Sequence, residues 1–376
     1  MRVLFTCGGT AGHINPALGV AGRIRELIPD AEILFVGAEG KMETELVPRE
    51  GYALRTIRIA GFRRGLSPKS LKENLRTADL LRRAMADSRR ILREFRPDVA
   101  VGTGGYVCFP VLRQAARLGI PTAVHESNAV PGLTTRLLER SADQIMVGLE
   151  ESRNAYRDPS KVELTGTPVR VEFLHTEKTR ARRELGLPAD EPIVVATFGS
   201  LGAGYMNERM LELIRAMGPD PGFRLIYGTG KQYYDAVRGA LTTDALRSGR
   251  IDVREYIYDM PKIMAAADVL LCRAGASTIG ELTFLGKPAV IVPSPNVVNH
   301  HQEKNARVLA EAGAARMLLE GQFTGEDLLR TVTELLSDPA ALAAMHEASA
   351  TMGVRNATDR ITSIVLGLAE RSKNKG

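Results

Sequence analysis

The sequence predicts an α/β protein made of two Rossmann-like domains, each built on a parallel sheet. Three observations lead to this prediction. Short β-branched and apolar segments alternate with stretches whose apolar residues recur at helical spacing, as in doubly wound sheets. The same alternation begins again at Ile193. The chain of 376 residues is also too long for one ordinary hydrophobic core.

The first half alternates strands and helices from its second residue onward. Apolar runs such as "RVLF" and "EILFV" indicate buried strands, and helical spacing of apolar residues separates them. This order favours a parallel sheet with helices on both faces. The expected strands are 2–7, 32–36, 54–59, 98–101, 121–124 and 144–147, and the expected helices include 16–28, 70–95 and 109–118.

The pattern changes between residues 163 and 192, where "ELTGTPVR", a short charged helix and "LGLPADEP" follow one another. We interpret this segment as a linker between an N-terminal domain over 1–163 and a C-terminal domain over 164–354. A last helix, over about 355–370, can pack back on the first domain. The second half restarts with strand, turn and helix over 193–214, and further strands are expected at 223–227, 251–255, 268–272 and 289–292.

Composition indicates a globular protein that stays in a reducing compartment. Hydrophobic residues make up 44% and charged residues 25%, and no apolar run approaches the ~18–20 residues that cross a bilayer. No signal peptide is recognisable, so we expect no export. Cys7, Cys108 and Cys272 are far apart, which excludes a cysteine zinc site and favours small buried thiols.

The net charge of +6 comes from one segment. Between Arg55 and Arg96 thirteen Lys/Arg face four Asp/Glu, a balance of +9, so the rest of the chain sums to −3. Such localised charge favours one anionic partner and argues against nucleic-acid binding. Two interpretations of the helix in this segment stay open: a core-facing helix with a solvated basic face, or a helix resting on anionic lipid.

Nucleotide fingerprints and metal motifs are missing from the chain. "GSLGAG" and "GTGGYV" do not satisfy G-x-G-x-x-G, and no P-loop is present, which argues against a dehydrogenase or a P-loop kinase. Neither Asp-x-Asp nor HExxH occurs, so we expect no metal ion and no other cofactor.

Four glycine-containing turns follow predicted strands, two in each half. They are "GGTAGH", "GTGGY", "FGSLGA" and "CRAGASTIGE". Glycine lets the backbone approach a ligand, and the following helix start offers unpaired N–H groups, so the set favours a phosphorylated ligand. Ligands of open parallel sheets bind beyond the carboxyl ends of the strands, which predicts an active site in a central cleft between the domains.

The turn "GGTAGH" ends in His13, three residues before Pro16. We expect Pro16 in the first turn of the following helix, where its missing N–H costs nothing. His13 is then held at the ligand-facing end of the turn. A histidine there is a candidate general base, and a purely structural histidine is the alternative.

Polar residues follow other predicted strands. In "RAGASTIGEL" a helix is expected to begin at Ala276, with Thr278 as a capping residue and Glu281 facing vicinal hydroxyls such as those of a ribose. The alternative role of Glu281 is to complement the helix dipole. "HESNAVPG", which begins at His125, and the pair Gln302 and Asn305 suit a hydroxyl-rich ligand such as a sugar, or are ordinary loop residues.

Six motifs in order resemble the MurG family of glycosyltransferases. They are "GGTAGH", "GGYVCFP", "HESNAVPGLTTR", "GTPVR", "CRAGASTIGE" and "NHHQEKNA", and together they cover nearly the whole chain. Members of that family transfer N-acetylglucosamine from UDP-N-acetylglucosamine to the lipid-linked muramyl-pentapeptide precursor of peptidoglycan. The resemblance implies a GT-B fold, in which the N-terminal domain binds the acceptor and the C-terminal domain binds the UDP-sugar.

The resemblance also implies residue roles. His13 is the expected base, and the acceptor side is lined by Tyr106, His125 and Glu126. The residues expected to bind the donor are Thr10, Ala11, Gly12 and Asn128 from the first domain, Arg170 and Ser200 near the diphosphate, Ile257 through its backbone at the uracil, Ala276, Ser277, Thr278, Ile279, Gly280 and Glu281 at the phosphates and ribose, and Gln302 and Asn305 at the sugar hydroxyls.

The implied reaction is an inverting, metal-independent transfer from lipid I to lipid II at the cytoplasmic face of the inner membrane. The implied partners are UDP-N-acetylglucosamine, the undecaprenyl-pyrophosphoryl-muramyl-pentapeptide acceptor and an anionic membrane surface, with no nucleic acid. A UDP-N-acetylglucosamine 2-epimerase and a non-catalytic scaffold are the alternatives. The chain departs from the family pattern at Ala11, Ser127, Thr167, Phe198 and Leu201.

Overall fold

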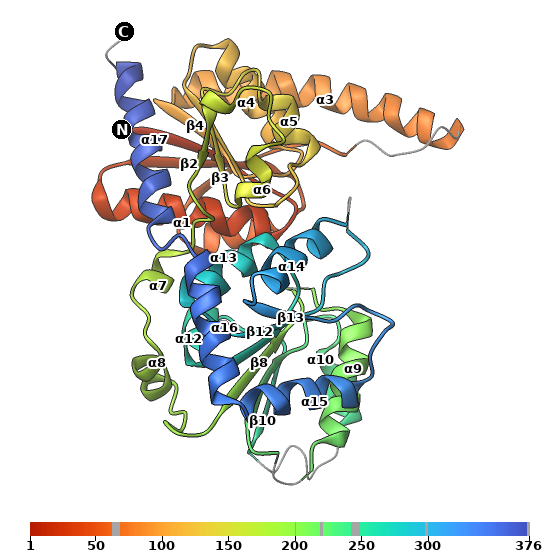
Figure 1. The fold of residues 1–376 in the computed structure, drawn as a ribbon. Coiled ribbons are helices and arrows are strands. Elements are labelled where there is room, and N and C mark those ends of the chain that lie inside the picture. The colour runs from red at the N-terminus through yellow and green to blue at the C-terminus, as the bar shows by residue number, and fades with distance from the viewer. Residues whose placement is uncertain (62–67, 200, 219–220, 242–248, 298–299, 374–376) are drawn as a thin grey trace. The chain divides into compact units, whose positions relative to one another are not determined.

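The predicted α/β class is confirmed by a computed structural model, in which the strands form two parallel sheets. The structure describes residues 1–61, 68–199, 201–218, 221–241, 249–297 and 300–373, without the side chains of 68–73, 75 and 372–373. The chain divides into two units (Figure 1). The first unit comprises Met1–Val171 and Arg355–Gly376, and the second comprises Glu172–Val354.

The first unit is built on a sheet of seven strands within the described residues, in the order β3-β2-β1-β4-β5-β6-β7. Every neighbouring pair is parallel, and Val3 of β1 lies opposite Ile33 of β2 and Val99 of β4. Its elements are β1 (Arg2–Thr6), α1 (Ala11–Leu27), β2 (Glu32–Ala38), α2 (Glu43–Arg49), β3 (Ala53–Ile57), α3 (Pro68–Phe95), β4 (Val99–Gly102), α4 (Cys108–Arg117), β5 (Thr122–Glu126), α5 (Leu133–Leu138), β6 (Gln144–Val147), α6 (Glu150–Arg153), the 3-10 helix Pro159–Lys161, β7 (Val162–Leu164) and α17 (Ala357–Lys373).

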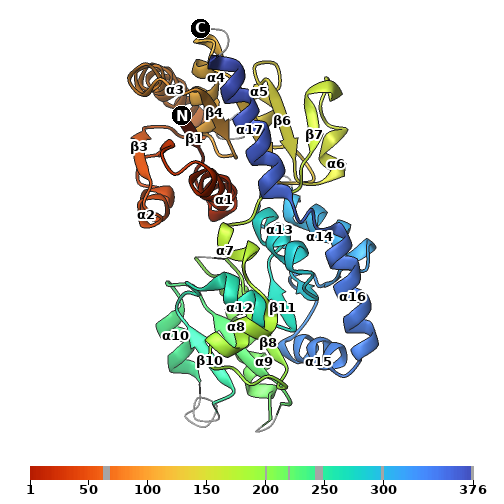
Figure 2. The same ribbon diagram turned by 90° about the vertical axis from the view of Figure 1, so that its left-hand side faces the viewer.

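Alternating side chains of this sheet enter two hydrophobic cores. Val3 and Phe5 of β1 pack with residues of α1 and α17 on one face, while Leu4 packs with residues of α3 and α4 on the other. Figure 2 shows α17 running beside α1. Both faces are therefore covered, as buried parallel sheets require.

The buried face of helix α3 partly matches the predicted one, because Leu92 is buried and Phe95 packs against the core, but it is rotated toward Thr77, Ala84 and Ser88. The spacing predicts a buried stripe through Leu71, Leu75, Ala78, Leu81, Met85, Leu92 and Phe95. Leu71 and Leu75 lie outside the described side chains, and Ala78 is exposed. The buried residues are Thr77, Ala84, Ser88, Ile91 and Leu92, whose small members let α3 approach α4 closely.

Helix α1 begins earlier than predicted. It starts at Ala11, so Pro16 lies in its second turn and not in its first. The fixed φ of proline fits a helix, and the one bond that Pro16 removes is the bond to the carbonyl of Gly12, at the helix start. His13 therefore lies in the first turn of α1.

The boundary between the units lies after Val171, inside the segment 163–192 that the sequence analysis interprets as a linker. The first unit extends to Val171 because β7 joins its sheet and Val169 bonds to α17. The Val169 N–H donates to Thr358 Oγ1 (3.2 Å), and that hydroxyl donates to the Val169 carbonyl (3.1 Å). The carboxyl-terminal helix α17 belongs to this first unit.

The second unit repeats the scheme with six described strands in the order β10-β9-β8-β11-β12-β13. Val194 and Leu271 lie in a core shared with α9 and α15. The three-residue strands β7 and β13 carry too short a pattern to be predicted. The elements of the second unit are α7 (Val171–Leu174), α8 (Lys178–Glu184), β8 (Ile193–Thr197), α9 (Gly204–Ala216), β9 (Arg224–Gly228), α10 (Tyr234–Ala240), β10 (Ile251–Arg254), α12 (Met260–Ala266), β11 (Val269–Cys272), α13 (Ala276–Leu285), β12 (Ala289–Ile291), α14 (His301–Glu311), β13 (Ala315–Met317), α15 (Gly325–Leu336) and α16 (Pro339–Met352).

Replacing Gly19 in the middle of α1 by alanine is expected to destabilise the first unit. A Cβ at Gly19 would overlap the carbonyl oxygen of Val169, and backbone cannot rotate away as a side chain can. We expect Gly19→Ala to lower the free energy of unfolding by about 1–3 kcal/mol. Gly367→Ala in α17, where nothing lies near the added Cβ, should raise it by about 0.5–1 kcal/mol. Urea unfolding of both variants tests this, and equal effects would contradict the packing of α1 on Val169.

Candidate active site

Each sheet reverses its strand order at one point. The reversal lies between β1 and β4 in the first unit and between β8 and β11 in the second. At such a point the connections leave toward opposite faces, and the turns at the carboxyl ends open a crevice where ligands bind. All four predicted glycine turns follow these four strands. The structure therefore marks one candidate ligand region in each unit.

In the first unit, the turns after β1 and β4 are in direct backbone contact. The Gly8 N–H donates to the Gly104 carbonyl (3.2 Å). A Cβ on Gly105 would overlap the carbonyl of Gly8, so only glycine permits this approach. The Thr103 hydroxyl donates to the His13 carbonyl (2.7 Å). Thr103 is a residue that the sequence analysis missed, although it stands directly after a predicted strand.

His13 is held by its own turn. Its Nδ1 lies 2.9 Å from the Gly8 carbonyl oxygen and 3.4 Å from Thr10 Oγ1. Because a carbonyl can only accept, Nδ1 carries the proton in the shorter bond. The ring also packs against Gly104, where a side chain would overlap it. Nε2 is then the acceptor nitrogen, the form that a general base needs.

The loop after β5 is organised around the carboxylate of Glu126. Its Oε1 accepts from the N–H (3.0 Å) and the side-chain amide (2.9 Å) of Asn128, and its Oε2 accepts from the Gly132 N–H (2.9 Å) and the Thr135 hydroxyl (2.9 Å). Glu126 is buried and engaged on both oxygens. Its expected contact with the acceptor stays a prediction, as does that of Asn128 with the donor.

His125 is buried beside this loop. Its Nε2 donates to the Gly166 carbonyl (2.9 Å), and its Nδ1 accepts from the Ser127 hydroxyl (3.2 Å). Burial lowers the pKa of His125 below the ordinary value of 6.5, because the charged ring would lose its hydration. Ser127, one of the departures from the family pattern, thus supports the neutral ring.

Tyr106 and Arg170 are two further residues of the first unit that the sequence analysis singles out. Tyr106 follows β4 and is 59% exposed, so its ring is open to a ligand. Arg170 lies beside the middle of α1, with Nη1 4.0 Å from Glu50 Oε1. Their expected contacts with the acceptor and the diphosphate stay predictions. The backbone N–H groups of Ala11 and Gly12 stand at the start of α1, ahead of its first internal hydrogen bonds.

In the second unit, β11 leads through Arg273 to the start of α13. The residue that caps this helix is Gly275, and Thr278 makes no capping hydrogen bond, so the predicted capping role of Thr278 is wrong. Gly275 adopts the extended conformation from which the helix begins, one turn before Thr278. The residues from Ala276 through Ile279 to Gly280 form the first turns of the helix, and the Ser277 hydroxyl lies 3.5 Å from Glu281 Oε1.

Two buried side chains hold the turn after β11 in place through hydrogen bonds to backbone carbonyls. Asn305 on α14 donates through Nδ2 to the Ala274 carbonyl (3.2 Å). Arg273 donates to the Val292 carbonyl (3.0 Å) and pairs with Glu320. Gln302 Oε1 accepts from the Ser294 N–H (2.9 Å), which ties α14 to the loop after β12. Arg273 and Glu320 were not predicted, because 47 residues separate them.

The remaining donor residues lie after β8 and β10. Ser200 lies outside the described residues, so its expected place near the diphosphate stays a prediction. Phe198 is part of the hydrophobic core next to Met206 of α9, while Leu201 is exposed. Ile257 is buried, and its side chain lies 3.2 Å from the place that a Cβ on Gly228 would take, at the end of β9.

All three cysteines are free and buried, Cys7 and Cys108 in the first unit and Cys272 at the end of β11 in the second. Burial raises the pKa of the Cys108 thiol and that of Cys272 to about 12, and raises that of Cys7 well above 9, so all three are neutral thiols. Among the described residues, no group of three or more His, Cys, Asp or Glu side chains could hold a metal ion. Across the same residues, no helix is both long and apolar enough to span a bilayer.

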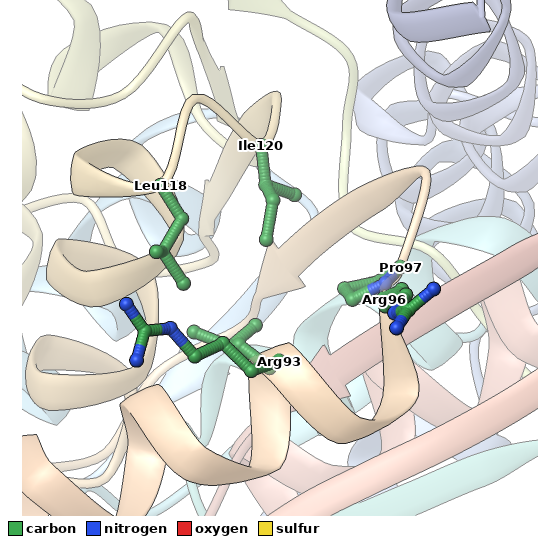
Figure 3. A pocket seen from close by; sticks show the side chains of 6 residues that line it. Arg93, Arg96, Pro97, Leu118 and Ile120 are labelled. Atoms are coloured by element: carbon green, nitrogen blue, oxygen red, sulfur yellow. The ribbon is translucent and has the colours of Figure 1, made fainter.

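A surface hollow in the first unit lies at the opposite end of its sheet. It is lined by Leu92, Arg93, Arg96, Pro97, Leu118 and Ile120. Pro97 and Ile120 precede β4 and β5, so the hollow belongs to the amino-terminal ends of these strands. Figure 3 shows the guanidinium groups of Arg93 and Arg96 on either side of it. This position is remote from the glycine turns and is not the candidate site.

Comparisons with known proteins place this geometry in a family. The glycosyltransferase family 28 N-terminal domain matches residues 3–147, and the glycosyltransferase family 28 C-terminal domain matches residues 193–361. Two relatives bear the name UDP-N-acetylglucosamine–N-acetylmuramyl-(pentapeptide) pyrophosphoryl-undecaprenol N-acetylglucosamine transferase. The relative from Acetivibrio thermocellus is 43% identical over 97% of each chain, and the one from Desulforudis audaxviator is 44% identical over 98% of this chain and 99% of its own.

Solved structures agree with these relatives. The crystal structure of Acinetobacter baumannii MurG matches with a TM-score of 0.71 and 27% identity, covering 97% of this chain and 99% of that one. A UDP-GlcNAc 2-epimerase from Neisseria meningitidis bound to UDP-GlcNAc matches with a TM-score of 0.64, covering 98% of this chain and 100% of that one. Its identity is 16%, so it shares the fold alone.

Replacing His125 by glutamine is expected to reduce the acid sensitivity of the first unit. Below pH 6.5 His125 takes up a proton in the unfolded chain but stays neutral in the folded chain, because folding lowers the pKa of His125. Folding stability is therefore lost as the pH falls from 6.5 toward the folded pKa, by up to about 1.4 kcal/mol per pH unit. Glutamine keeps a donor for the Gly166 carbonyl without titrating.

Urea unfolding at pH 7.5 and 5.5 measures this difference. The gap in unfolding free energy between wild type and His125→Gln should narrow by about 1 kcal/mol at the lower pH. A parallel decline of both proteins would contradict a neutral, buried His125.

Proposed function

Because the chain belongs to the MurG family within glycosyltransferase family 28, we propose that it transfers N-acetylglucosamine from UDP-N-acetylglucosamine to the muramyl-pentapeptide of an undecaprenyl-pyrophosphate-linked precursor. The observation that carries the proposal is identity of 43–44% with relatives of that name over nearly the full length of each chain. The chain is thus a hexosyltransferase of peptidoglycan synthesis that converts lipid I to lipid II.

The second unit binds the donor. The start of α13 offers N–H groups for phosphate oxygens, and Glu281 one turn later accepts hydrogen bonds from the ribose hydroxyls. Gln302 is expected to contact the sugar hydroxyls, and the backbone of Ile257 the uracil. Asn305, which has no exposed surface, supports the site by bonding the Ala274 carbonyl. Two bonds support this assignment, because they keep the turn after β11 in one geometry: Asn305 bonds the Ala274 carbonyl in the turn, and Arg273 in the turn bonds the Val292 carbonyl after β12.

The first unit supplies the base and the acceptor site. His13 Nε2 removes the proton of the acceptor hydroxyl as its oxygen attacks the anomeric carbon, in one step that inverts the configuration. Thr10, Ala11, Gly12 and Asn128 approach the donor sugar. Tyr106 lines the acceptor side, while His125 and Glu126 act by holding the loop that carries Asn128.

The departing UDP gains negative charge in the transition state. Helix starts at α9 and α13 and the guanidinium of Arg170 stabilise this charge, as preorganised donors do in other transfer reactions. Ser200 and Ser277 stand at these helix starts in the sequence. The 2-epimerase alternative rests on a shared fold at 16% identity and is not proposed.

Membrane attachment is peripheral and uses the first unit. Helix α5 exposes Leu133 (68%) and Leu137 (54%) one turn apart, and Arg136 and Arg140 are exposed beside them. Helix α4 packs between α5 and the basic helix α3. Apolar side chains among arginines fit the interface of an anionic bilayer, and we assign them to its cytoplasmic face.

Labelled UDP-N-acetylglucosamine tests the proposed function directly. With the lipid-linked muramyl-pentapeptide, the label should pass to the lipid fraction, and without it the sugar should stay on the nucleotide. Conversion of UDP-N-acetylglucosamine without any acceptor would indicate the epimerase reaction, and absence of turnover in both samples would indicate a scaffold.

The role of His13 predicts a selective loss in His13→Ala. Turnover should fall about 10²–10⁴-fold, the usual range for a general base, while the UDP affinity stays close to that of the wild type. Steady-state transfer and titration calorimetry with UDP measure the two quantities. Unchanged turnover would remove His13 from this role.

The role of α5 predicts that membrane binding depends on its two exposed leucines. The double variant Leu133→Asp, Leu137→Asp should bind phosphatidylglycerol-containing vesicles at least about 10-fold more weakly, since two buried apolar side chains are lost. Leu27→Asp, on the 51% exposed Leu27 of α1, is the matched control and should bind normally. Equal loss in both variants would contradict a membrane site at α5.

A further inference from the structure

Glu43 is a buried carboxylate that none of the roles above uses. It is the first residue of α2 and has no exposed surface. Its Oε1 accepts from the Ala38 N–H (2.7 Å), and its Oε2 accepts from the Gly9 N–H (2.9 Å). Both bonds use the carboxylate as an acceptor, which is the behaviour of the ionised group.

Two glycines make room for this carboxylate. A Cβ on Gly8 would overlap Glu43 Oε1, and a Cβ on Gly37 would overlap Glu43 Cγ. The ionised group is thus enclosed against the "GG" of the turn, and it is stabilised by backbone N–H groups. The partners of the Glu43 carboxylate oxygens are the backbone N–H groups of Ala38 and Gly9. Burying a carboxylate costs free energy unless hydrogen bonds compensate for its lost hydration. The charge of Glu43 at this turn therefore indicates a functional role.

The bond to Gly9 and the bond to His13 share one peptide group. The N–H of Gly9 donates to Glu43, and the C=O of Gly8, on the same peptide, accepts from His13 Nδ1. A carboxylate on the N–H side draws electron density toward the carbonyl oxygen, because hydrogen bonds in a chain polarise one another. The carbonyl then holds the Nδ1 proton more strongly.

We propose that Glu43 is the positioning carboxylate of His13, acting through the Gly8–Gly9 peptide group. This inference rests on the proposed function, in which His13 is the base. When Nε2 takes the proton of the acceptor hydroxyl, the ring becomes positive while the Nδ1 proton stays on the bond to Gly8. The carboxylate stabilises that positive ring and takes no proton itself, as the aspartate does in Ser-His-Asp triads.

The other titratable groups around the turn carry no charge that could act on His13 in place of Glu43. Burial raises the pKa of the Cys7 and Cys108 thiols, so both stay neutral. The negative charge of Glu43 itself contributes to raising the pKa of each thiol. Thr10, the remaining polar side chain at the His13 ring, does not ionise.

Glu43→Gln tests the proposal with little change in shape. Its amide carries no charge and can accept only one of the two N–H bonds. We expect the midpoint of the His13 titration, followed by NMR without substrate, to move to lower pH by about 0.5–1 unit, less than a directly contacting charge produces. The acidic limb of the pH–rate profile should move in the same direction, and turnover should fall about 10- to 100-fold.

Asp98→Asn is the matched control for a lost carboxylate. Asp98 Oδ2 accepts from the Arg2 N–H (2.8 Å) at the amino-terminal end of the same sheet. This variant should leave the His13 titration and the pH–rate profile unchanged. If Glu43→Gln does not fold, Glu43→Asp is the substitute, since it keeps the charge but moves it away from the turn. We then expect about half of the shift in the His13 titration that is expected for Glu43→Gln.

A double-mutant cycle tests the link between Glu43 and His13 separately from the role of His13 as the base. In a His13→Ala background, Glu43→Gln should not lower turnover further if it acts through His13. A shifted His13 titration with normal turnover would support the linkage and overturn the base role of His13. An unshifted titration in a folded Glu43 variant would overturn the linkage whatever the enzyme transfers.

Discussion

The close contact between the turns after β1 and β4 is the constraint on which the first unit's site depends. The reversal of strand order brings these turns together, and the Gly8–Gly104 hydrogen bond joins their backbones. Only glycine allows this approach at Gly105 and leaves room for the His13 ring at Gly104. The result is a histidine whose orientation is determined by backbone atoms. These contacts hold the ring in one orientation, which is what the proposed general base requires.

The second unit has the same reversal of strand order, but there it places a helix start instead of a histidine. Its strand order reverses between β8 and β11, and the turn after β11 leads into the start of α13. Here the surrounding side chains, Asn305 and Arg273, hold backbone carbonyls and leave the helix N–H groups for a ligand. Under the proposed function, the base and the acceptor side belong to the first unit, and the helix start that faces the phosphates belongs to the second. Such a division would let one fold serve transferases with very different acceptors.

Much of the fold was predictable because its signals are local. Alternating apolar segments predicted the sheets, and glycines after strands predicted the turns at both reversals. The predicted start of α1 is wrong because proline is typical of the first turn of a helix, whereas Pro16 lies in the second turn, where its fixed φ is also tolerated. Glu43 was not predicted, since 34 residues separate it from Gly9 and no spacing rule connects them. A buried charge that is balanced by backbone N–H groups is visible only in three dimensions.

The ring of His13 offers the most direct test of the account, because everything proposed for the first unit requires one particular tautomer. A long-range ¹H–¹⁵N correlation spectrum, recorded on ¹⁵N-labelled protein at a pH where the ring is neutral and assigned by comparison with His13→Ala, shows which nitrogen carries the proton. The account predicts the proton on Nδ1, bonded to the Gly8 carbonyl, with Nε2 bare. A neutral ring with its proton on Nε2 would contradict it.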